Sequence, residues 1–224
     1  MYKKQTINYY FKLTELINES VKKKDTIIIS INGAPGSGKS TLALWLKNEV
    51  KRNNLSSIII PTDDYMCMPR GERLFSGVSG LQNKAYATNL LFQHIHLLSK
   101  IPPNTEKNIR FPRYRSESGL FYQQSRMVKF KNLLIIEGLM SFLPVLHEMI
   151  DVYVWLETPI AHRVKLRVDV DVERGYDKAQ RNLSLALHER DWPEFEKKQY
   201  NFMRRGVSGG KAVFRAEWDD VRDC

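Results

Sequence analysis

The sequence predicts an α/β protein in which a parallel sheet is covered by helices on both faces. Two observations lead to this fold class. Short apolar runs of strand length alternate along the chain with longer segments of helical periodicity, and this alternation is typical of parallel sheets. A glycine-rich loop also lies directly between the first apolar run and the helical segment after it. Because ligands of such sheets bind at the carboxyl ends of the strands, we expect the functional residues there.

The expected elements follow in order from these patterns. Leu13, Leu16, Ile17 and Val21 recur at helical spacing and predict an amphipathic helix ahead of the first strand. The segment 67–83 contains Gly, Pro and Ser without clear periodicity and is interpreted as a functional loop. Further helices are expected at 40–52, 85–100 and 159–170, and strands at 26–31, 57–60, 108–114, 126–130, 133–136 and 151–156.

Length, charge and cysteine content limit the class of protein. The 224 residues, 42% of them hydrophobic, indicate one domain over residues 1–224. We expect a cytoplasmic protein without a membrane partner, because no run reaches the roughly 18–20 apolar residues of a membrane span and the first residues show no cleavable signal. Cys67 and Cys224 are far apart and predict neither a disulfide framework nor a zinc site. The formal net charge of +10 predicts anionic partners.

The glycine-rich loop matches the motif G-x-x-x-x-G-K-[ST] and has the strand before it and the helix after it that this motif requires. Its glycines let backbone N–H groups turn inward, and the N-terminus of the helix favours negative charge. Lys39 is expected to reach the β- and γ-phosphates of ATP, and the Ser40 hydroxyl to hold Mg²⁺. The predicted nucleotide-binding residues are Gly33, Ala34, Pro35, Gly36, Ser37, Gly38, Lys39, Ser40, Thr41 and, further along the chain, Arg163.

Two carboxylates are expected at strand ends near this loop. Asp63 follows the second strand, where it can accept a proton from a hydroxyl that attacks the γ-phosphate. Its alternative role is that of a turn or helix-cap residue. Glu137 ends the strand LLIIE and can hold Mg²⁺ directly or through water. The alternative for Glu137 is a solvated strand end.

Arginines after the last clear strand predict a small lid over approximately residues 163–178. Arg163, Arg167 and Arg174 are 4 and 7 residues apart, so a continuous helix would place them near one face. Such a face suits a polyphosphate, and the alternative is a solvated face paired with nearby acids. The tail over approximately residues 194–224 is predicted as a helix with a mobile end, and it shows no clear final strand.

The order of these motifs resembles the uridine kinase and phosphoribulokinase family of P-loop kinases, to which pantothenate and plant-type glycerate kinases are similar. The resemblance covers approximately residues 26–178 and rests on GAPGSGKST, TDDY, PRY, LLIIEG and HRVKLRVDVDVERG. It implies a P-loop NTPase fold with an Arg-rich lid, the use of ATP and Mg²⁺, and a small hydroxyl compound as partner. It also implies a catalytic set of Asp63 as base, Lys39, and the lid residues Arg167 and Arg174. The substrate-binding residues expected beside them are Asp64, Tyr65, Arg113 and Tyr114.

The sequence leaves the phosphate acceptor open. A uridine- or cytidine-like nucleoside leads, with glycerate, pantothenate or a sugar phosphate as alternatives. Ala87 stands where we would align an Asp of uridine kinases, and Arg115 follows PRY where relatives commonly have Asp. A catalytically weak, nucleotide-binding regulatory protein is a second class of function. The basic residues are dispersed, which disfavours a nucleic-acid partner, and a homo-oligomer stays open.

Overall fold

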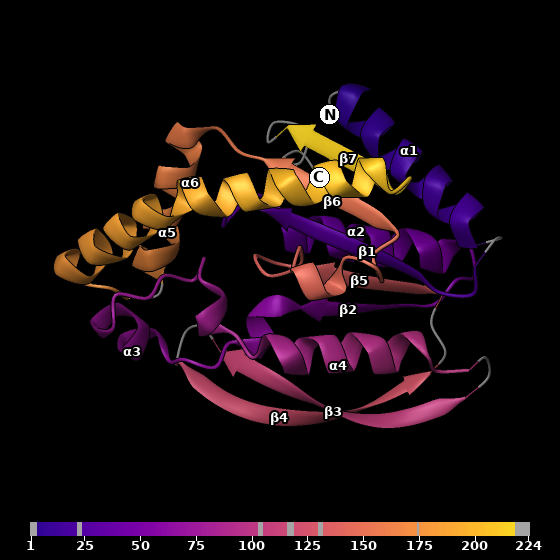
Figure 1. Cartoon of the computed structure of the whole chain (residues 1–224), viewed down its shortest axis with the longest axis horizontal. Helices are drawn as coiled ribbons and strands as arrows, with labels where there is room; N and C mark the ends of the chain where they lie inside the picture. Colours follow the sequence, from indigo (N-terminus) through magenta and orange to yellow (C-terminus); the bar gives the residue numbers. More distant parts are fainter. Residues whose placement is uncertain are drawn as a thin grey trace.

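The computed structural model describes residues 4–21, 24–102, 105–115, 119–129, 132–173 and 175–217. Among these residues the central sheet has five strands, all parallel, in the order β2-β5-β1-β6-β7 (Figure 1). The predicted α/β class with a parallel sheet is confirmed. The strands are β1 (Ile27–Gly33), β2 (Ser57–Pro61), β5 (Leu133–Glu137), β6 (Val152–Glu157) and β7 (Ala212–Glu217).

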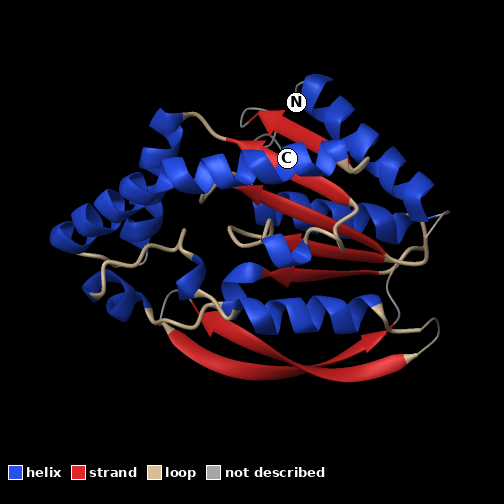
Figure 2. Cartoon of the chain, viewed as in Figure 1, coloured by secondary structure: helices blue, strands red, loops and turns tan. Residues whose placement is uncertain are grey.

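Helices cover both faces of the sheet (Figure 2). Alternate side chains of the strands point to opposite faces, so Ile27 and Ile29 pack with one group of helices while Ile28 packs with the other. The first face carries α1 (Lys4–Val21) and α2 (Lys39–Arg52), and the second carries α4 (Thr88–Ser99) and the long helix α6 (Lys178–Ser208). The apolar run of each central strand is therefore explained by burial on both sides.

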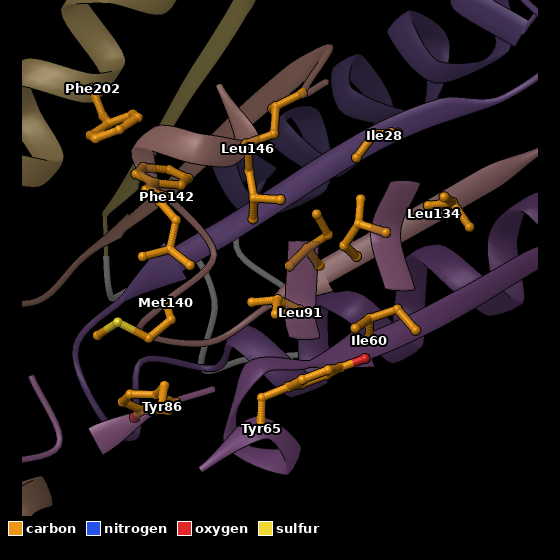
Figure 3. Packing of buried hydrophobic residues seen from close by; sticks show 14 of the residues in the cluster. Ile28, Ile60, Tyr65, Tyr86, Leu91, Leu134, Met140, Phe142, Leu146 and Phe202 are labelled. Atoms are coloured by element: carbon orange, nitrogen blue, oxygen red, sulfur yellow. The ribbon is translucent and has the colours of Figure 1, made fainter. Parts of the chain in front are cut away.

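The core on the second face connects the sheet with α4. Figure 3 shows the side chains of Ile28, Ile60 and Leu134 gathered around Leu91 of α4, with Tyr65 beside them. Beyond α4 lies the antiparallel pair β3 (Glu106–Arg115) and β4 (Leu120–Lys129) (Figure 1). None of the helices in the described ranges combines the length and the apolar character that crossing a membrane requires.

The segment interpreted as a loop at 67–83 contains a short helix, α3 (Arg70–Phe75), and a 3-10 turn begins at its end, Asn83–Ala85. Helix α3 has only about one and a half turns, which is too short for a periodic signal, and this explains why the sequence did not predict it. Another 3-10 turn, Thr62–Tyr65, connects β2 to this segment, and a third lies at Pro144–Leu146. The helix expected from residue 85 begins at Thr88.

The lid and the tail differ most from the sequence interpretation. Helix α5 (Ile160–Glu173) is followed by α6, which begins at Lys178, well before residue 194. The Asp177 side chain accepts a hydrogen bond from the Gln180 N–H, and the Gln180 side chain accepts one from the Asp177 N–H, so a capping box fixes the start of α6. The tail does contain a final strand, β7, which pairs with β6 at the sheet edge. Residues 218–224, including Cys224, lie outside the described residues.

Candidate functional site

The phosphate loop connects β1 to α2 and has a backbone conformation that glycine favours. Gly36 has φ +76°, and a Cβ atom built there would lie 2.9 Å from Leu166 Cδ2 of α5. The loop ends at Gly38, and α2 begins with no acidic residue in its first turn and no side-chain cap. The positive end of this helix therefore has no carboxylate of its own in that turn, which suits an anionic ligand.

Lys39 is held over this loop. Its Nζ donates hydrogen bonds to the backbone oxygens of Gly33, at 3.1 Å, and Ala34, at 2.6 Å. Burial lowers the pKa of Lys39, and the nearby carboxylates of Glu137 and Asp63 act in the opposite direction. The Ser37 hydroxyl is buried and has no hydrogen-bond partner among the described residues. A buried hydroxyl of this kind fits an incoming phosphate oxygen.

Ser40 and Glu137 come together where β5 ends beside β1. The register pairs Ile31 of β1 with Glu137, and Ser40 Oγ donates a hydrogen bond to Glu137 Oε1 at 3.2 Å. Burial raises the pKa of Glu137 to about 7, while the Lys39 ammonium lowers it. These two side-chain oxygens form a donor set that suits Mg²⁺, which needs only one or two protein ligands beside its waters.

The two aspartates after β2 have different surroundings. Asp63 is exposed, lines the cavity described below, and interacts electrostatically with both Lys39 and Glu137. Asp64 instead forms an ion pair with Arg113 of β3. Burial raises the pKa of Asp64, although Arg113 lowers it. Of the two carboxylates, that of Asp63 is therefore the one that lines the cavity.

Tyr65 does not line this cavity. Its side chain is buried, and its hydroxyl shares a 2.9 Å hydrogen bond with His94 Nδ1 of α4. Tyr114 of β3, in contrast, does line the cavity, and its hydroxyl is buried with no hydrogen-bond partner among the described residues. Of these two predicted substrate contacts, only Tyr114 is placed at the cavity.

The cavity has a volume of about 220 Å³ and opens at the carboxyl ends of the strands. Its first wall is the phosphate loop with Asp63 and Glu137, its second wall is the segment that contains α3, and its third is formed by α5, α6 and the turn between them. Figure 1 shows α3 opposite α5 and α6 beyond the strand ends. The predicted site residues along it are Pro35, Gly36, Lys39, Ser40, Asp63, Tyr114, Glu137 and Arg167. Ala34, Ser37, Gly38 and Thr41 belong to the same loop and the first turn of α2.

The predicted lid arginines separate in the structure. Arg167 lines the cavity, pairs with Asp171 and donates a hydrogen bond to Ser184 Oγ at 2.8 Å. Arg163 lies against α6. Its guanidinium is 4.3 Å from the centre of the Trp192 ring, and its Nη1 is 3.7 Å from Glu196 Oε1. Arg163 therefore does not line this cavity with Arg167, and its contact with a nucleotide stays a prediction. Arg174 lies outside the described residues.

Several residues at the cavity were not predicted. Arg70 and Arg73 of α3 line it and are buried, and the Arg70 guanidinium lies 5.0 Å from the centre of the Tyr176 ring. The sequence signal that could have found them is their spacing of three in PRGERLF, which puts both on one side of a helix. His188 of α6 also lines the cavity, and burial together with nearby arginines lowers its pKa to about 4.

Comparison with known proteins connects this site with one family. Residues 28–201 match the model of the family described as Phosphoribulokinase / Uridine kinase. The uridine kinase of Alkaliphilus metalliredigens is 29% identical over 66% of this chain and 69% of its own length. The chloroplastic phosphoribulokinase of Chlamydomonas reinhardtii is 24% identical over 77% of this chain, which spans only 49% of that protein. The solved structure of the YGR205w protein shares the fold, with a TM-score of 0.60 at 15% identity over 96% of this chain and 94% of its own.

Proposed function

Because the chain belongs to the phosphoribulokinase/uridine kinase family of P-loop small-molecule kinases, we propose that it transfers the γ-phosphoryl group of ATP to a hydroxyl of a small acceptor. One observation carries this proposal. The exposed carboxylate of Asp63 lines the same cavity as Lys39, Ser40 and Glu137. A protein that only binds a nucleotide has no need of a carboxylate at that point, whereas a kinase needs one that can accept the proton of the acceptor hydroxyl.

The phosphate loop is proposed to hold the donor. Backbone N–H groups at the start of α2 and the Lys39 ammonium would bind the β- and γ-phosphates of ATP, and Ser37 would donate to a phosphate oxygen. Ser40 and Glu137 would hold Mg²⁺. When bound with ATP, the ion neutralises the negative charge of the phosphates during transfer. The 2.6 Å hydrogen bond from Lys39 to the Ala34 carbonyl keeps the ammonium close to this position before the nucleotide arrives.

Asp63 is proposed to act on the acceptor. As the acceptor oxygen forms its bond to the γ-phosphorus, the bond between that phosphorus and the leaving oxygen of ADP breaks, and the hydroxyl proton passes to the Asp63 carboxylate. Asp64, tied to Arg113, would fix the 3-10 turn that carries Asp63. Tyr65 would stabilise the same turn through the hydrogen bond between its hydroxyl and His94. Arg167, and by extension Arg174, would balance charge on the transferring group.

The relatives indicate two kinds of acceptor, since one is a uridine kinase and another is a phosphoribulokinase. A uridine- or cytidine-like nucleoside is thus one candidate, and a sugar phosphate is another. Glycerate and pantothenate remain candidates by resemblance. On this proposal Tyr114 and Arg113 lie on the acceptor side, because β3 contacts the turn that carries Asp63.

A coupled assay of ADP formation from Mg-ATP tests the function directly. The panel would contain uridine, cytidine, pantothenate, glycerate and ribulose 5-phosphate, each with the wild-type protein and with Asp63→Asn. The expected result is turnover that depends on one acceptor class and is lost in the variant. ATP binding with no acceptor-dependent turnover for any compound would contradict the proposal and favour the regulatory alternative.

A further inference from the structure

The wall of the cavity that contains α3 carries positive charge that the chemistry above does not use. Arg70 and Arg73 lie on α3, are 8% and 9% exposed, and both line the cavity. On the basis of the proposed kinase function, we infer that the acceptor carries an anionic group, a phosphate or a carboxylate, which binds to Arg73 with the support of Arg70 and Tyr114. The acceptor class would then be an anionic hydroxyl compound and not a neutral nucleoside.

The charges along the cavity favour an anion at this wall. Among the described residues, the carboxylates that line the cavity are Asp63 and Glu137, and the proposal above uses Asp63 as the base and Glu137 for Mg²⁺. Arg167 pairs with Asp171, which is 1% exposed, and the proposal above already assigns Arg167 to the transferring group. Within the described ranges no carboxylate oxygen lies within 4.0 Å of the Arg73 guanidinium, and its Nε is buried without a hydrogen-bond partner. A buried guanidinium is costly unless an anion or hydrogen-bond acceptors satisfy it.

The Arg73 guanidinium lies against the loop that follows α3. A Cβ atom built on Gly80 would lie 3.2 Å from Arg73 Nη1, so the bare backbone of Gly80 makes room for the guanidinium. The Tyr86 hydroxyl donates to the Gly80 carbonyl at 3.0 Å. Ser79 Oγ donates to Asp191 of α6 at 2.7 Å. These contacts fix the loop against which the Arg73 guanidinium lies, and a guanidinium can bind two oxygens of a phosphate or carboxylate at once.

The position of Arg73 connects it with the acceptor and not with ATP. Lys39, Ser37 and the start of α2 already form a binding site for the donor phosphates. Arg73 instead belongs to the segment that begins at Asp63, so the same piece of chain would hold both the base and the anion site. Tyr114 adds a second donor there, since its hydroxyl is buried and has no hydrogen-bond partner in the part of the chain that the structure describes. A neutral nucleoside would leave the charge of Arg73 uncompensated.

Matched pairs of acceptors test this inference. Each pair has similar hydroxyl groups but only one anionic member: glycerate with glycerol, pantothenate with panthenol, and ribulose 5-phosphate with ribulose, with uridine as the neutral nucleoside. We expect the anionic member of one pair to be preferred by about 100-fold or more in kcat/KM, and that pair distinguishes a carboxylate from a phosphate. Arg73→Gln should lower kcat/KM for this acceptor by about 10- to 100-fold, mainly through KM, with the KM for ATP within about twofold of wild type.

Two further variants control for folding and for charge. Arg73→Lys keeps the positive charge and should recover part of the loss, and it replaces Arg73→Gln if that variant does not reach the wild-type Tm. Arg52→Gln removes an exposed arginine of α2 that pairs with Glu49, and it should leave every parameter unchanged. Preference for uridine or another neutral acceptor, with turnover unaffected by Arg73→Gln, would overturn the inference and leave the kinase proposal intact.

A binding measurement separates failure of the inference from failure of the kinase function. If no acceptor supports turnover, the kinase proposal fails, and the anion site is then tested alone. The shift in Tm caused by inorganic phosphate or glycerate would be measured with Mg-ADP saturating. A shift in wild type that is lost in Arg73→Gln supports the site. An equal shift in both proteins, or no shift in wild type, overturns it.

Discussion

Ser40 and Glu137 meet across the carboxyl edge of the sheet, with the Ser40 hydroxyl donating to the Glu137 carboxylate at 3.2 Å. The hydrogen bond joins the first turn of α2 to the end of β5, two elements that are 97 residues apart in sequence. Burial of this carboxylate raises its pKa to about 7. Without a bound cation, ionised Glu137 is therefore an unfavourable group in the folded protein, although the adjacent Lys39 offsets part of the cost.

Glu137→Gln should change how stability depends on pH. In the unfolded chain the carboxyl has its ordinary pKa near 4.5, whereas in the folded protein it is about 7. The folded state thus holds a proton that the unfolded state releases, and the free energy of unfolding should fall as pH rises from about 4.5 to about 7, by roughly 3 kcal/mol at most. The variant has no such loss, so above pH 7 it should be the more stable protein in the absence of ligand.

Thermal unfolding of both proteins without Mg-ATP at a series of pH values between 4.5 and 8 measures this difference. The wild-type protein should also release a proton when it binds Mg-ATP near pH 7, since cation binding requires the ionised carboxylate. Calorimetric titrations in buffers of different ionisation enthalpy detect that proton. Identical pH profiles for wild type and variant would show that Glu137 is not the titrating group.

Lys39→Ala should lower kcat by about 100-fold or more, because it removes a positioned charge from the transferred phosphoryl group. Lys47→Ala is the matched control, since Lys47 lies on the same helix and is exposed. Steady-state kinetics with the preferred acceptor measure both. Near-normal activity of Lys39→Ala would remove the phosphate loop from the mechanism.

Asp63→Asn should reduce kcat by about 10²- to 10⁴-fold with little change in ATP affinity, since the amide cannot accept the acceptor's proton. Asp64→Asn provides the contrast, because Asp64 pairs with Arg113. That variant should lower Tm and raise the acceptor KM, with a smaller effect on kcat. Equal losses of turnover and ATP affinity in Asp63→Asn would argue against its role as base.

The sequence predicted which residues meet at the carboxyl edge of the sheet, because each of them lies in a local pattern. The phosphate loop, the strand LLIIE and the aspartates after β2 are short motifs, and the parallel sheet brings the ends of their strands together. Glu137 could be placed beside the loop only if β5 neighboured β1, and the sheet order confirms that it does.

The walls of the cavity formed by α3, α5 and α6 were less predictable because they depend on contacts between distant segments. Helix α3 is six residues long and gives no periodic pattern. The difference between Arg163 and Arg167 depends on where α6 packs, since Trp192 and Ser184 of that helix contact one arginine each. Strand β7 was missed because it is an edge strand whose Val213 and Phe214 are only partly buried and whose Arg215 is exposed.

Arg167→Ala should slow the phosphoryl-transfer step by about 10³-fold, if its guanidinium balances charge as an arginine finger does. Its pairing with Asp171 and Ser184 holds the side chain along the cavity before ligands bind. Single-turnover kinetics with the preferred acceptor isolate the chemical step. Lys165→Ala, on the exposed side of the same helix, is the control. An unchanged single-turnover rate in Arg167→Ala would show that the ion pair of Arg167 with Asp171 has only a structural role.

Gly138→Ala should disturb the site through the backbone next to Glu137. Gly138 has φ +124°, and a Cβ atom there would lie 2.1 Å from Thr62 Oγ1, directly before Asp63. Either the 3-10 turn of Asp63 or the end of β5 must move, so we expect a loss of about 3 kcal/mol in stability and at least a 10-fold loss of kcat.

Gly210→Ala is the control that separates the effect of a steric clash from that of backbone strain. Gly210 has φ +71°, and no atom lies within 4 Å of an added Cβ. It should cost only about 1 kcal/mol, without a kinetic effect. Denaturant unfolding and kcat measured on both variants test this difference, and equal effects at the two glycines would contradict the close packing of Gly138 against Thr62.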